Sequence, residues 1–254
     1  MPKLSVLVTA YNASEWIKEA LDSVLGQSFT DWECLIGDDC STDDTAEVVS
    51  LLAGSDKRIK LSVELVNRGG GENIAGLMRR ATGDICVELG ADDYFLDAET
   101  LARIAAEYDT FPATEITSGS FVFIPDSGVV AYKPDMFWWK RWSFAKPLTW
   151  RTELGTRALA EYHDLQVDPE TGLMPRYGWD VAIYYPMRFL AKHYRWIPDV
   201  SYVYRTHDRN DTKDHRQDQL VTELRMAMHF DSILSRRMPW NPPEDLMLTS
   251  LATG

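Results

Sequence analysis

The sequence predicts an α/β fold in which a mixed, mainly parallel sheet is flanked by helices. Over residues 4–110, apolar runs of strand length alternate with amphipathic stretches of helix length, which is the pattern of successive βαβ units. Two of the runs, residues 32–37 and 85–89, lead into the acid pairs Asp38-Asp39 and Asp92-Asp93. In an open parallel sheet, ligands bind beyond the carboxyl ends of the strands. Both acid pairs should therefore face one crevice.

Each element of this first part has its own signal. The first apolar run is followed by an amphipathic stretch with Ser14 as its N-cap and Gly26 just past its end. After the second run, Ser41 and Asp44 have the spacing of a capping box, which favours a helix start. The expected elements are strands over 4–9, 32–37, 59–66 and 85–90, helices over 14–25, 42–52, 74–81 and 98–108, and a glycine-rich loop over 67–73.

The second part of the chain has a different texture, with more aromatic residues, more proline and weaker periodicity. Residues 137–142 form an aromatic and basic cluster, which suits stacking on a sugar as well as it suits a core or an oligomer contact. The expected elements are a hairpin over 116–124 and 129–133, a helix from about 180 to 193, a strand over 201–204, a mobile loop over 205–219 and a C-terminal helix from 220.

Composition limits the classes of function. The 254 residues include 26 basic and 39 acidic ones, and the formal net charge of -13 disfavours a general nucleic-acid-binding role. The three cysteines have no metal-ligand spacing and indicate a reducing compartment. No apolar run approaches the length of a membrane span, so we expect a soluble, cytoplasmic protein. Peripheral contact with the inner face of a membrane and the oligomeric state stay open.

The acid pairs suggest the chemistry. Two adjacent carboxylates repel each other unless a cation lies between them, and a divalent metal that carries a phosphate is the usual solution. The competing interpretation is that the acids only begin the helices that follow them. We favour that structural interpretation for Asp43 and Asp44, and a ligand-binding one for Asp38, Asp39, Asp92 and Asp93.

Several of these stretches together resemble the family 2 inverting glycosyltransferases of the GT-A fold, the nucleotide-diphospho-sugar transferase fold. The resemblance covers roughly residues 4–110, in order and in spacing. It implies one GT-A domain over 1–254, with a nucleotide-sugar-binding half over 1–110, an acceptor and catalytic half over 111–215 and a helical extension over 216–254. The stretches that carry it are residues 5–12, 20–28, 37–43, 81–84 and 90–93.

The resemblance implies a donor site at the carboxyl ends of the first, second and fourth strands. In the family an acid after the second strand reads the base or the ribose, which suits a carboxylate that accepts hydrogen bonds. A basic residue further on often contacts the donor, and Arg68 could take that place, against a simple solvated arginine. The residues expected to contact the nucleotide sugar are Thr9, Ala10, Tyr11, Asp38, Asp39, Arg68, Asn73, Ala91 and Asp92.

The resemblance also implies a metal, Mn²⁺ or Mg²⁺, that bridges the two phosphates of the donor. Asp92 and Asp93 would hold it, and His207 would complete the shell, although a lone histidine before a polar loop is as often exposed. Gly90 stands where the family's DxD motif usually has its first acid. Since one or two protein carboxylates can suffice for a hard cation, this departure should weaken the site without abolishing it.

Asp180 matches the aspartate that acts as general base in the family, while Trp179 replaces the acid before it. A base is needed because an acceptor hydroxyl is a poor nucleophile until its proton is removed. The structural alternative for Asp180 is an N-cap. Asp164 and Asp168 are lesser candidates for the base.

We therefore expect a metal-dependent inverting glycosyltransferase that uses a nucleotide sugar, with UDP as the expected nucleotide, and a glycan or lipid-linked acceptor. One alternative is a non-catalytic nucleotide-sugar-binding subunit, which Gly90 and Trp179 make plausible. Another is a phosphoacceptor signalling domain, which also gathers acids and Mg²⁺ at strand ends. That class is disfavoured because the chain is about twice the expected size and the acids after the fourth strand would have no role.

Overall fold

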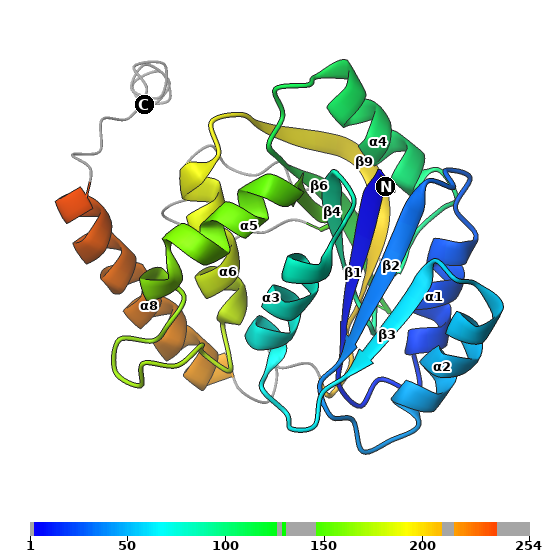
Figure 1. Ribbon diagram of the computed structural model, residues 1–254, viewed down its shortest axis with the longest axis horizontal. Coiled ribbons are helices and arrows are strands. Elements are labelled where there is room, and N and C mark those ends of the chain that lie inside the picture. The colour runs from blue at the N-terminus through cyan, green and yellow to red at the C-terminus, as the bar shows by residue number, and fades with distance from the viewer. Residues whose placement is uncertain (1–2, 126–128, 131–145, 210–215, 238–254) are drawn as a thin grey trace.

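The computed structural model describes residues 3–125, 129–130, 146–209 and 216–237 (Figure 1). The aromatic and basic cluster over 137–142 lies outside the described residues. So do residues 131–133 of the expected hairpin and most of the expected loop over 205–219. Among the residues that are described, none of the helices has both the length and the apolar character that crossing a membrane requires.

The described strands form one sheet in the order β3-β2-β1-β4-β8-β6-β9-β5, with β7 paired to β6. The α/β class and the mixed sheet are confirmed, but only four of the eight strand pairings are parallel. The strands are β1 (Leu4–Ala10), β2 (Trp32–Asp38), β3 (Ile59–Val63), β4 (Ile85–Gly90), β5 (Tyr94–Phe95), β6 (Ile116–Ile124), β7 (Val129–Val130), β8 (Leu148–Arg151) and β9 (Tyr194–Arg205).

Helices cover both faces of this sheet. Figure 1 shows α1 and α2 on one side of the strands and α3, α5 and α6 on the other, with α8 beyond α6. The helices are α1 (Ile17–Leu25), α2 (Thr45–Ser55), α3 (Gly70–Arg80), α4 (Thr100–Thr110), α5 (Thr152–Glu161), the short 3₁₀ helix η1 (His163–Leu165), α6 (Trp179–Leu190) and α8 (Arg216–Arg237).

Alternating side chains on the central strands build two cores. Val6 and Val8 of β1 point to the core shared with α1 and α4, whereas Leu7 points to the core shared with α3, α5 and α6. This alternation is why strands that are buried on both faces read as continuous apolar runs. A third, smaller cluster fixes α8 on α6, where the rings of Tyr185 and Phe230 lie 4.6 Å apart.

Several expected boundaries were wrong. The N-cap position of α1 is Trp16, not Ser14, because the Ser14 hydroxyl instead donates to Asp43 at 2.7 Å. Ser41 does not cap α2 either, since its hydroxyl donates to Asp38. β3 ends at Val63, and α6 ends at Leu190. The expected hairpin of β6 and β7 is confirmed over its described residues, where Phe121 pairs with Val130.

In the second half, β8 and α5 were missed, and β9 was predicted only in part. β8 and α5 lie in the stretch with weak periodicity, and β9 begins seven residues before the expected strand, at Tyr194 rather than at residue 201. Pro198 interrupts the run of β-formers in β9, and the pairing of β6 with β9 is irregular between Ser118 and Phe121. A strand with a register shift does not keep the period of two that identifies it in a sequence.

A buried carboxylate joins the first strands at the end of the sheet away from the acid pairs. Glu33 of β2 accepts hydrogen bonds from the Ser5 hydroxyl at 2.7 Å and from the Thr82 amide and hydroxyl at 2.8 Å each. The Lys60 ammonium lies 2.7 Å from its other oxygen. Burial alone would raise the pKa of Glu33, but the bonds from Lys60, Thr82 and Ser5 outweigh it and lower the pKa to about 2.

We expect Glu33→Gln to lower the free energy of unfolding by about 2 to 4 kcal/mol at neutral pH, because an amide cannot accept all of these bonds. The folded-state pKa of Glu33 lies below its ordinary value of 4.5, so its contribution is present above that pH and disappears as the pH falls through about 2. Urea denaturation at several pH values measures the difference. Lys60→Met should cost less, since the Lys60 side chain is half exposed. A loss that stays constant down to about pH 3 would contradict the assignment.

Candidate active site

The strand register brings the expected site together. Thr9 of β1 lies opposite Gly37 of β2 and Gly90 of β4. The turns that follow these three residues carry Tyr11, the Asp38-Asp39 pair and the Asp92-Asp93 pair. All three turns therefore open at the same edge of the sheet, as parallel strands require.

The turns after β1 and β2 hold each other in place. The Asn12 amide N–H donates to the Ser41 hydroxyl at 2.8 Å, and the Asn12 side-chain oxygen accepts from the Thr42 amide at 2.8 Å. Asn12 and Cys40 both have positive φ angles, 50° and 63°. Asp43 accepts from the Thr45 amide at 3.0 Å, so its predicted structural role at the start of α2 is confirmed.

Asp38 and Asp39 are almost fully buried, with 0% and 3% of their surfaces exposed. Asp38 binds the amide and the hydroxyl of Ser41 through one oxygen. Asp39 accepts the backbone amides of Arg68 and Gly69, each at 2.7 Å, and so fixes the loop that leads into α3. In this structure the pair fixes the turn after β2 and the loop that leads into α3. Direct contact of either carboxylate with a nucleoside stays a prediction.

The other expected donor contacts differ in accessibility. Tyr11 has 49% of its surface exposed and can receive a planar ring, whereas Ala10 and Ala91 are buried at 3% and 5%. Thr9 is half-buried. A tyrosine that projects from a fixed turn offers a large apolar face at low conformational cost. Tyr11 is therefore the most accessible of these four residues.

Arg68 and Asn73 have structural partners. The Arg68 guanidinium is exposed and lies 3.5 Å from Glu64. The Asn73 amide donates to the Gly37 carbonyl at 2.8 Å, and its oxygen would lie 1.9 Å from a Cβ at position 37. Only glycine fits there, so Asn73 locks α3 onto β2. The contacts described for these two side chains are with Glu64 and Gly37, and none of them is with Asp92.

Asp92 and His207 form the centre of the site. Nε2 of His207 lies 3.0 Å from Oδ2 of Asp92, although the two residues are far apart in the chain. The His207 ring stacks on Trp16 with centroids 4.0 Å apart and an angle of 16° between the planes. Nδ1 accepts the amide N–H of Arg209 at 3.2 Å, which leaves Nε2 to face the carboxylate. Trp16 and Arg209 thus orient the imidazole.

Asp93 has a different position from the expected one. It is 4% exposed, and its two oxygens accept the Tyr202 hydroxyl at 2.5 Å and the Arg205 amide at 2.8 Å. Burial, and then the neighbouring charge of Asp92, raise the pKa of Asp93 well above its ordinary value. Asp93 therefore fastens the end of β9 to β4, and the role of metal ligand that we predicted for it is not favoured by this geometry.

Gly90 is closely surrounded. A Cβ at this position would lie 2.7 Å from a carboxylate oxygen of Asp93 and 2.9 Å from one of Asp92. An acid at position 90 would therefore require both aspartates to move. Among the described residues, no group of three or more His, Cys, Asp or Glu side chains is placed to hold a metal ion.

Asp180 lies in the first turn of α6, after Gly178 in a left-handed conformation. Burial, and then the charge of Glu223, raise the pKa of Asp180 to about 6, while Lys146 acts in the opposite direction. A carboxylate with such a pKa is suited to accept a proton near neutral pH. Of the two lesser candidates, Asp168 is buried and lies 3.1 Å from Arg225 of α8.

Trp179 fills the space at the start of α3. A Cβ on Gly70 would lie 2.6 Å from the indole nitrogen of Trp179, and a Cβ on Gly71 would lie 2.9 Å from the Cβ of Trp179. These two glycines at the start of α3 therefore serve close packing between α3 and α6. Trp179 belongs to this contact and to the core, where its ring meets that of Tyr184.

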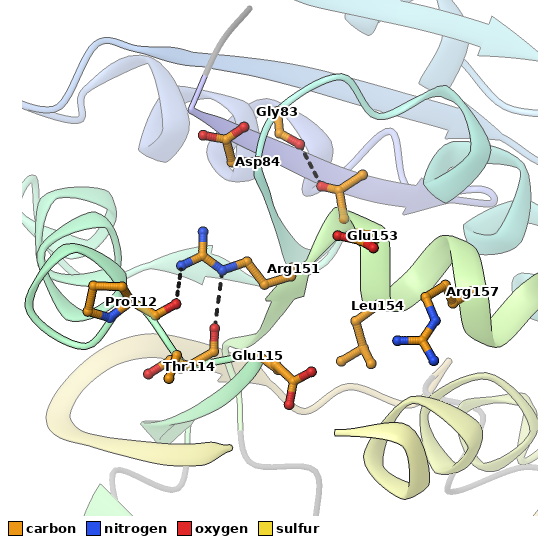
Figure 2. A pocket seen from close by; sticks show the side chains of 11 residues that line it. Gly83, Asp84, Pro112, Thr114, Glu115, Arg151, Glu153, Leu154 and Arg157 are labelled. Atoms are coloured by element: carbon orange, nitrogen blue, oxygen red, sulfur yellow. Dashed lines mark hydrogen bonds between the residues drawn. The ribbon is translucent and has the colours of Figure 1, made fainter. Parts of the chain in front are cut away.

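A cavity of about 470 Å³ lies elsewhere (Figure 2). Figure 2 shows Arg151 at one wall, with its guanidinium donating to the carbonyls of Pro112 and Thr114. Because Arg151 pairs with Ile85, this cavity is at the amino end of β4, whereas Asp92 follows the carboxyl end. It is not part of the candidate active site.

The sequence itself identifies the family. Residues 5–159, more than half of the chain, match the model of glycosyl transferase family 2. The chain belongs to this family. That placement agrees with the resemblance seen in the first strands and with the GT-A type of fold, and the family 2 match extends through β8 and into α5.

Individual family 2 relatives match shorter segments. The chain is 36% identical over 114 residues to the poly(ribitol-phosphate) beta-N-acetylglucosaminyltransferase TarS of Staphylococcus aureus, a match that covers 43% of this chain and 19% of TarS. It is 36% identical over 110 residues to the GalNAc(5)-diNAcBac-PP-undecaprenol beta-1,3-glucosyltransferase of Campylobacter jejuni, covering 42% of this chain and 36% of that enzyme. The matches thus span about a third or less of these relatives.

Solved structures show the same fold. TarS 1-349 in complex with UDP-GlcNAc superimposes with a TM-score of 0.69 at 21% identity, over 90% of this chain and 66% of that chain. The mannosyltransferase PcManGT from Pyrobaculum calidifontis, in complex with GDP-Man and Mn²⁺, gives a TM-score of 0.65 at 23% identity, over 90% and 64%. At these identities the likeness concerns the fold alone.

We expect Asp39→Asn to lower the free energy of unfolding by about 1 to 3 kcal/mol, because one of the two loop amides would face an NH₂ group. Hydrogen exchange at the amides of Arg68 and Gly69 should become faster. Asp44→Asn is the matched control, since Asp44 makes no capping bond, and it should change stability by less than about 0.5 kcal/mol. Unchanged exchange at Arg68 would mean that Asp39 does not anchor the loop.

Proposed function

We propose that this protein is an inverting glycosyltransferase, which moves a sugar from a nucleotide-diphosphate sugar to an acceptor hydroxyl in the synthesis of a polysaccharide, glycolipid or cell-surface glycan. The observation that carries the proposal is the strand register, which sets Thr9, Gly37 and Gly90 side by side at one edge of the sheet in a chain of glycosyl transferase family 2. Asp180, whose pKa is raised to about 6 by burial and then by the charge of Glu223, is the candidate base.

The donor would lie over the carboxyl ends of β1, β2 and β4. Tyr11 would stack on the base, and the turn and the loop that Asp38 and Asp39 fix would enclose the nucleoside. Backbone and side-chain groups near Ala91 and Asp92 would face the diphosphate. This placement is supported by the register that aligns Thr9, Gly37 and Gly90 at one edge of the sheet.

Asp92 and His207 would hold a divalent cation, Mn²⁺ or Mg²⁺, since Nε2 of His207 lies 3.0 Å from Oδ2 of Asp92. Because Nδ1 accepts the Arg209 amide here, metal binding at Nε2 would require the ring proton to move to Nδ1 and the Arg209 amide to give up its bond. When bound there, the metal would offset the negative charge on the departing diphosphate. Two protein ligands suit a site that is completed by the phosphates of the donor and by water.

The chemistry of transfer would then depend on Asp180. Its carboxylate would take the proton of the acceptor hydroxyl while that oxygen forms a bond to the anomeric carbon. The bond from the anomeric carbon to the phosphate oxygen would break in the same step, and the electron pair would leave with the nucleoside diphosphate. Displacement from the opposite side inverts the anomeric centre. Burial keeps Asp180 basic enough for this task.

We propose a UDP sugar as donor, because the TarS structure that this chain resembles holds UDP-GlcNAc. We propose a glycan or lipid-linked acceptor, because the Campylobacter enzyme is named for an undecaprenol-linked glycan. GDP sugars are the second choice, since PcManGT holds GDP-Man. A thermal-shift screen of UDP, GDP, dTDP and CDP sugars with and without Mn²⁺ would decide, because a ligand at about 100 times its Kd stabilises by about 2.7 kcal/mol. The cytoplasmic location, the membrane contact and the oligomeric state stay predictions.

A second candidate function is a nucleotide-sugar-binding subunit without catalysis. The crowding around Gly90 and the packing of Trp179 favour it, because both positions lack the acids expected there. The two functions differ in one measurement. Purified protein that binds a donor in the screen but neither hydrolyses nor transfers its sugar would support the binding subunit.

We expect Asp92→Asn to leave the fold intact and to abolish the metal-dependent part of donor binding, because a neutral amide cannot replace an anionic ligand. Calorimetry with UDP and Mn²⁺ measures the effect, and Asp22→Asn on the exposed face of α1 is the control. Unchanged affinity in the presence of Mn²⁺ would remove Asp92 from the metal site.

We expect Asp180→Asn to lower turnover by about 10²- to 10⁴-fold while donor affinity stays nearly unchanged. The same change should stabilise the protein at neutral pH. The folded-state pKa of about 6 lies above the ordinary value of 3.8, so the contribution of Asp180 to stability is present below that value and is lost as the pH rises through about 6. Near-normal turnover would exclude Asp180 as the base.

A further inference from the structure

A buried ion pair lies next to the candidate base and has no role in the account so far. Glu88 of β4 is 6% exposed, and one of its oxygens pairs with the ammonium of Lys146, just before β8. The Lys146 side chain is 19% exposed. Removing two charges from water costs several kcal/mol per ion, so a buried pair of this kind is weak evidence for a role in stability alone.

The pair faces the surface of α6 that carries Asp180. The Lys146 ammonium lies 5.9 Å from the ring centroid of Tyr184, and the Glu88 carboxylate raises the pKa of the Tyr184 hydroxyl that it faces. Tyr184 comes one helical turn after Asp180, so both side chains lie on the same face of the helix. Lys146 and Glu88 are therefore beside the candidate base, in the layer between β4 and α6.

Charges reach Asp180 from α8, from β4 and from the residue two positions before β8. Glu223 of α8 and Glu88 of β4 disfavour its ionised form, and Lys146 favours it. Burial acts with the two glutamates. Among the described residues that act on Asp180, Lys146 is thus the cation that opposes all of these effects.

We propose that Lys146 is a positioning residue for Asp180: Glu88 holds its ammonium against α6, and the ammonium keeps the carboxylate of Asp180 ionised and ready to accept a proton. This inference rests on the proposed function, because it assigns Lys146 a role through the candidate base. The lysine contacts neither donor nor acceptor in this role. It sets the pH above which the base is available.

The proposal makes opposite predictions for the two partners. Loss of the Lys146 ammonium removes a favourable charge and should shift the titration of Asp180 to higher pH. Loss of the Glu88 charge removes an unfavourable one and should shift it to lower pH. A pair that only supported packing would lower stability in both variants and would leave the titration where it is.

The test uses unfolding and needs no substrate. The variants Lys146→Met, Lys146→Arg and Glu88→Gln are each prepared with and without Asp180→Asn, as is the unmodified chain. The slope with pH of the difference in unfolding free energy within each couple, followed from about pH 5 to about pH 8.5, reports the titration of Asp180, and the pH at which this slope has fallen by half is the midpoint. Lys60→Met is the matched control, because it removes a lysine from another buried glutamate, Glu33, at the far end of the sheet.

We expect a midpoint near pH 6 in the unmodified chain. Lys146→Met should raise it by about one pH unit or more, and Glu88→Gln should lower it. Lys146→Arg and Lys60→Met should leave it unchanged. If Lys146→Met does not fold, the double variant Glu88→Gln with Lys146→Met is compared with Glu88→Gln alone, each with and without Asp180→Asn. The midpoint should be higher in the double variant, which lacks the lysine.

Equal midpoints with and without the Lys146 ammonium would overturn the inference. The proposed base is tested separately, by the turnover of Asp180→Asn. Normal turnover in that variant would overturn the base and leave the midpoints interpretable. An inactive Asp180→Asn variant with an unmoved midpoint in Lys146→Met would keep the base and exclude Lys146.

Discussion

The carboxylate of Asp93 joins the two halves of the molecule. It follows β4, which belongs to the parallel part of the sheet, and it binds the Tyr202 hydroxyl and the Arg205 amide of β9. The Tyr202 oxygen also accepts the amide N–H of Gly90 at 3.0 Å. Since the side chains of Asp93 and Tyr202 are buried, the loss of these bonds would leave unsatisfied polar atoms in the interior. These bonds therefore fix the carboxyl end of β9 against the end of β4.

The rest of the site depends on that position. Arg205 continues from β9 and donates from its guanidinium to the Asp92 carbonyl at 2.9 Å. Two residues later His207 meets the Asp92 carboxylate and the ring of Trp16. His207, which follows β9, thus faces Asp92, which follows β4, because the buried Asp93 fixes the end of β9. The geometry of the Asp92 and His207 pair is therefore set by the buried side chains of Asp93 and Tyr202.

The sequence predicted the first half of the fold well, because its strands are short, apolar and closed by turn residues. It also pointed to Asp92 and His207, which the structure brings together, and to Asp180, whose role as base stays a proposal. It could not predict that Asp93 is a structural group, since adjacent acids look alike until a partner such as Tyr202 is placed. β8 escaped prediction because four residues give too little pattern. Lys146 and Glu88 carried no signal, because a glutamate within an apolar run reads as an exception until its lysine is found.

The contact between Trp179 and the glycines at the start of α3 makes three positions change together. With the tryptophan present, any side chain on Gly70 or Gly71 would overlap it. A smaller residue at 179 would open a void between α3 and α6, and voids of this kind cost stability in proportion to their volume. An acid placed there alone would lose the packing of the indole ring against both glycines. An acid at position 179 would therefore need compensating changes at Gly70 and Gly71 at the same time. Single substitutions at any of the three positions are disfavoured, which tends to retain the tryptophan.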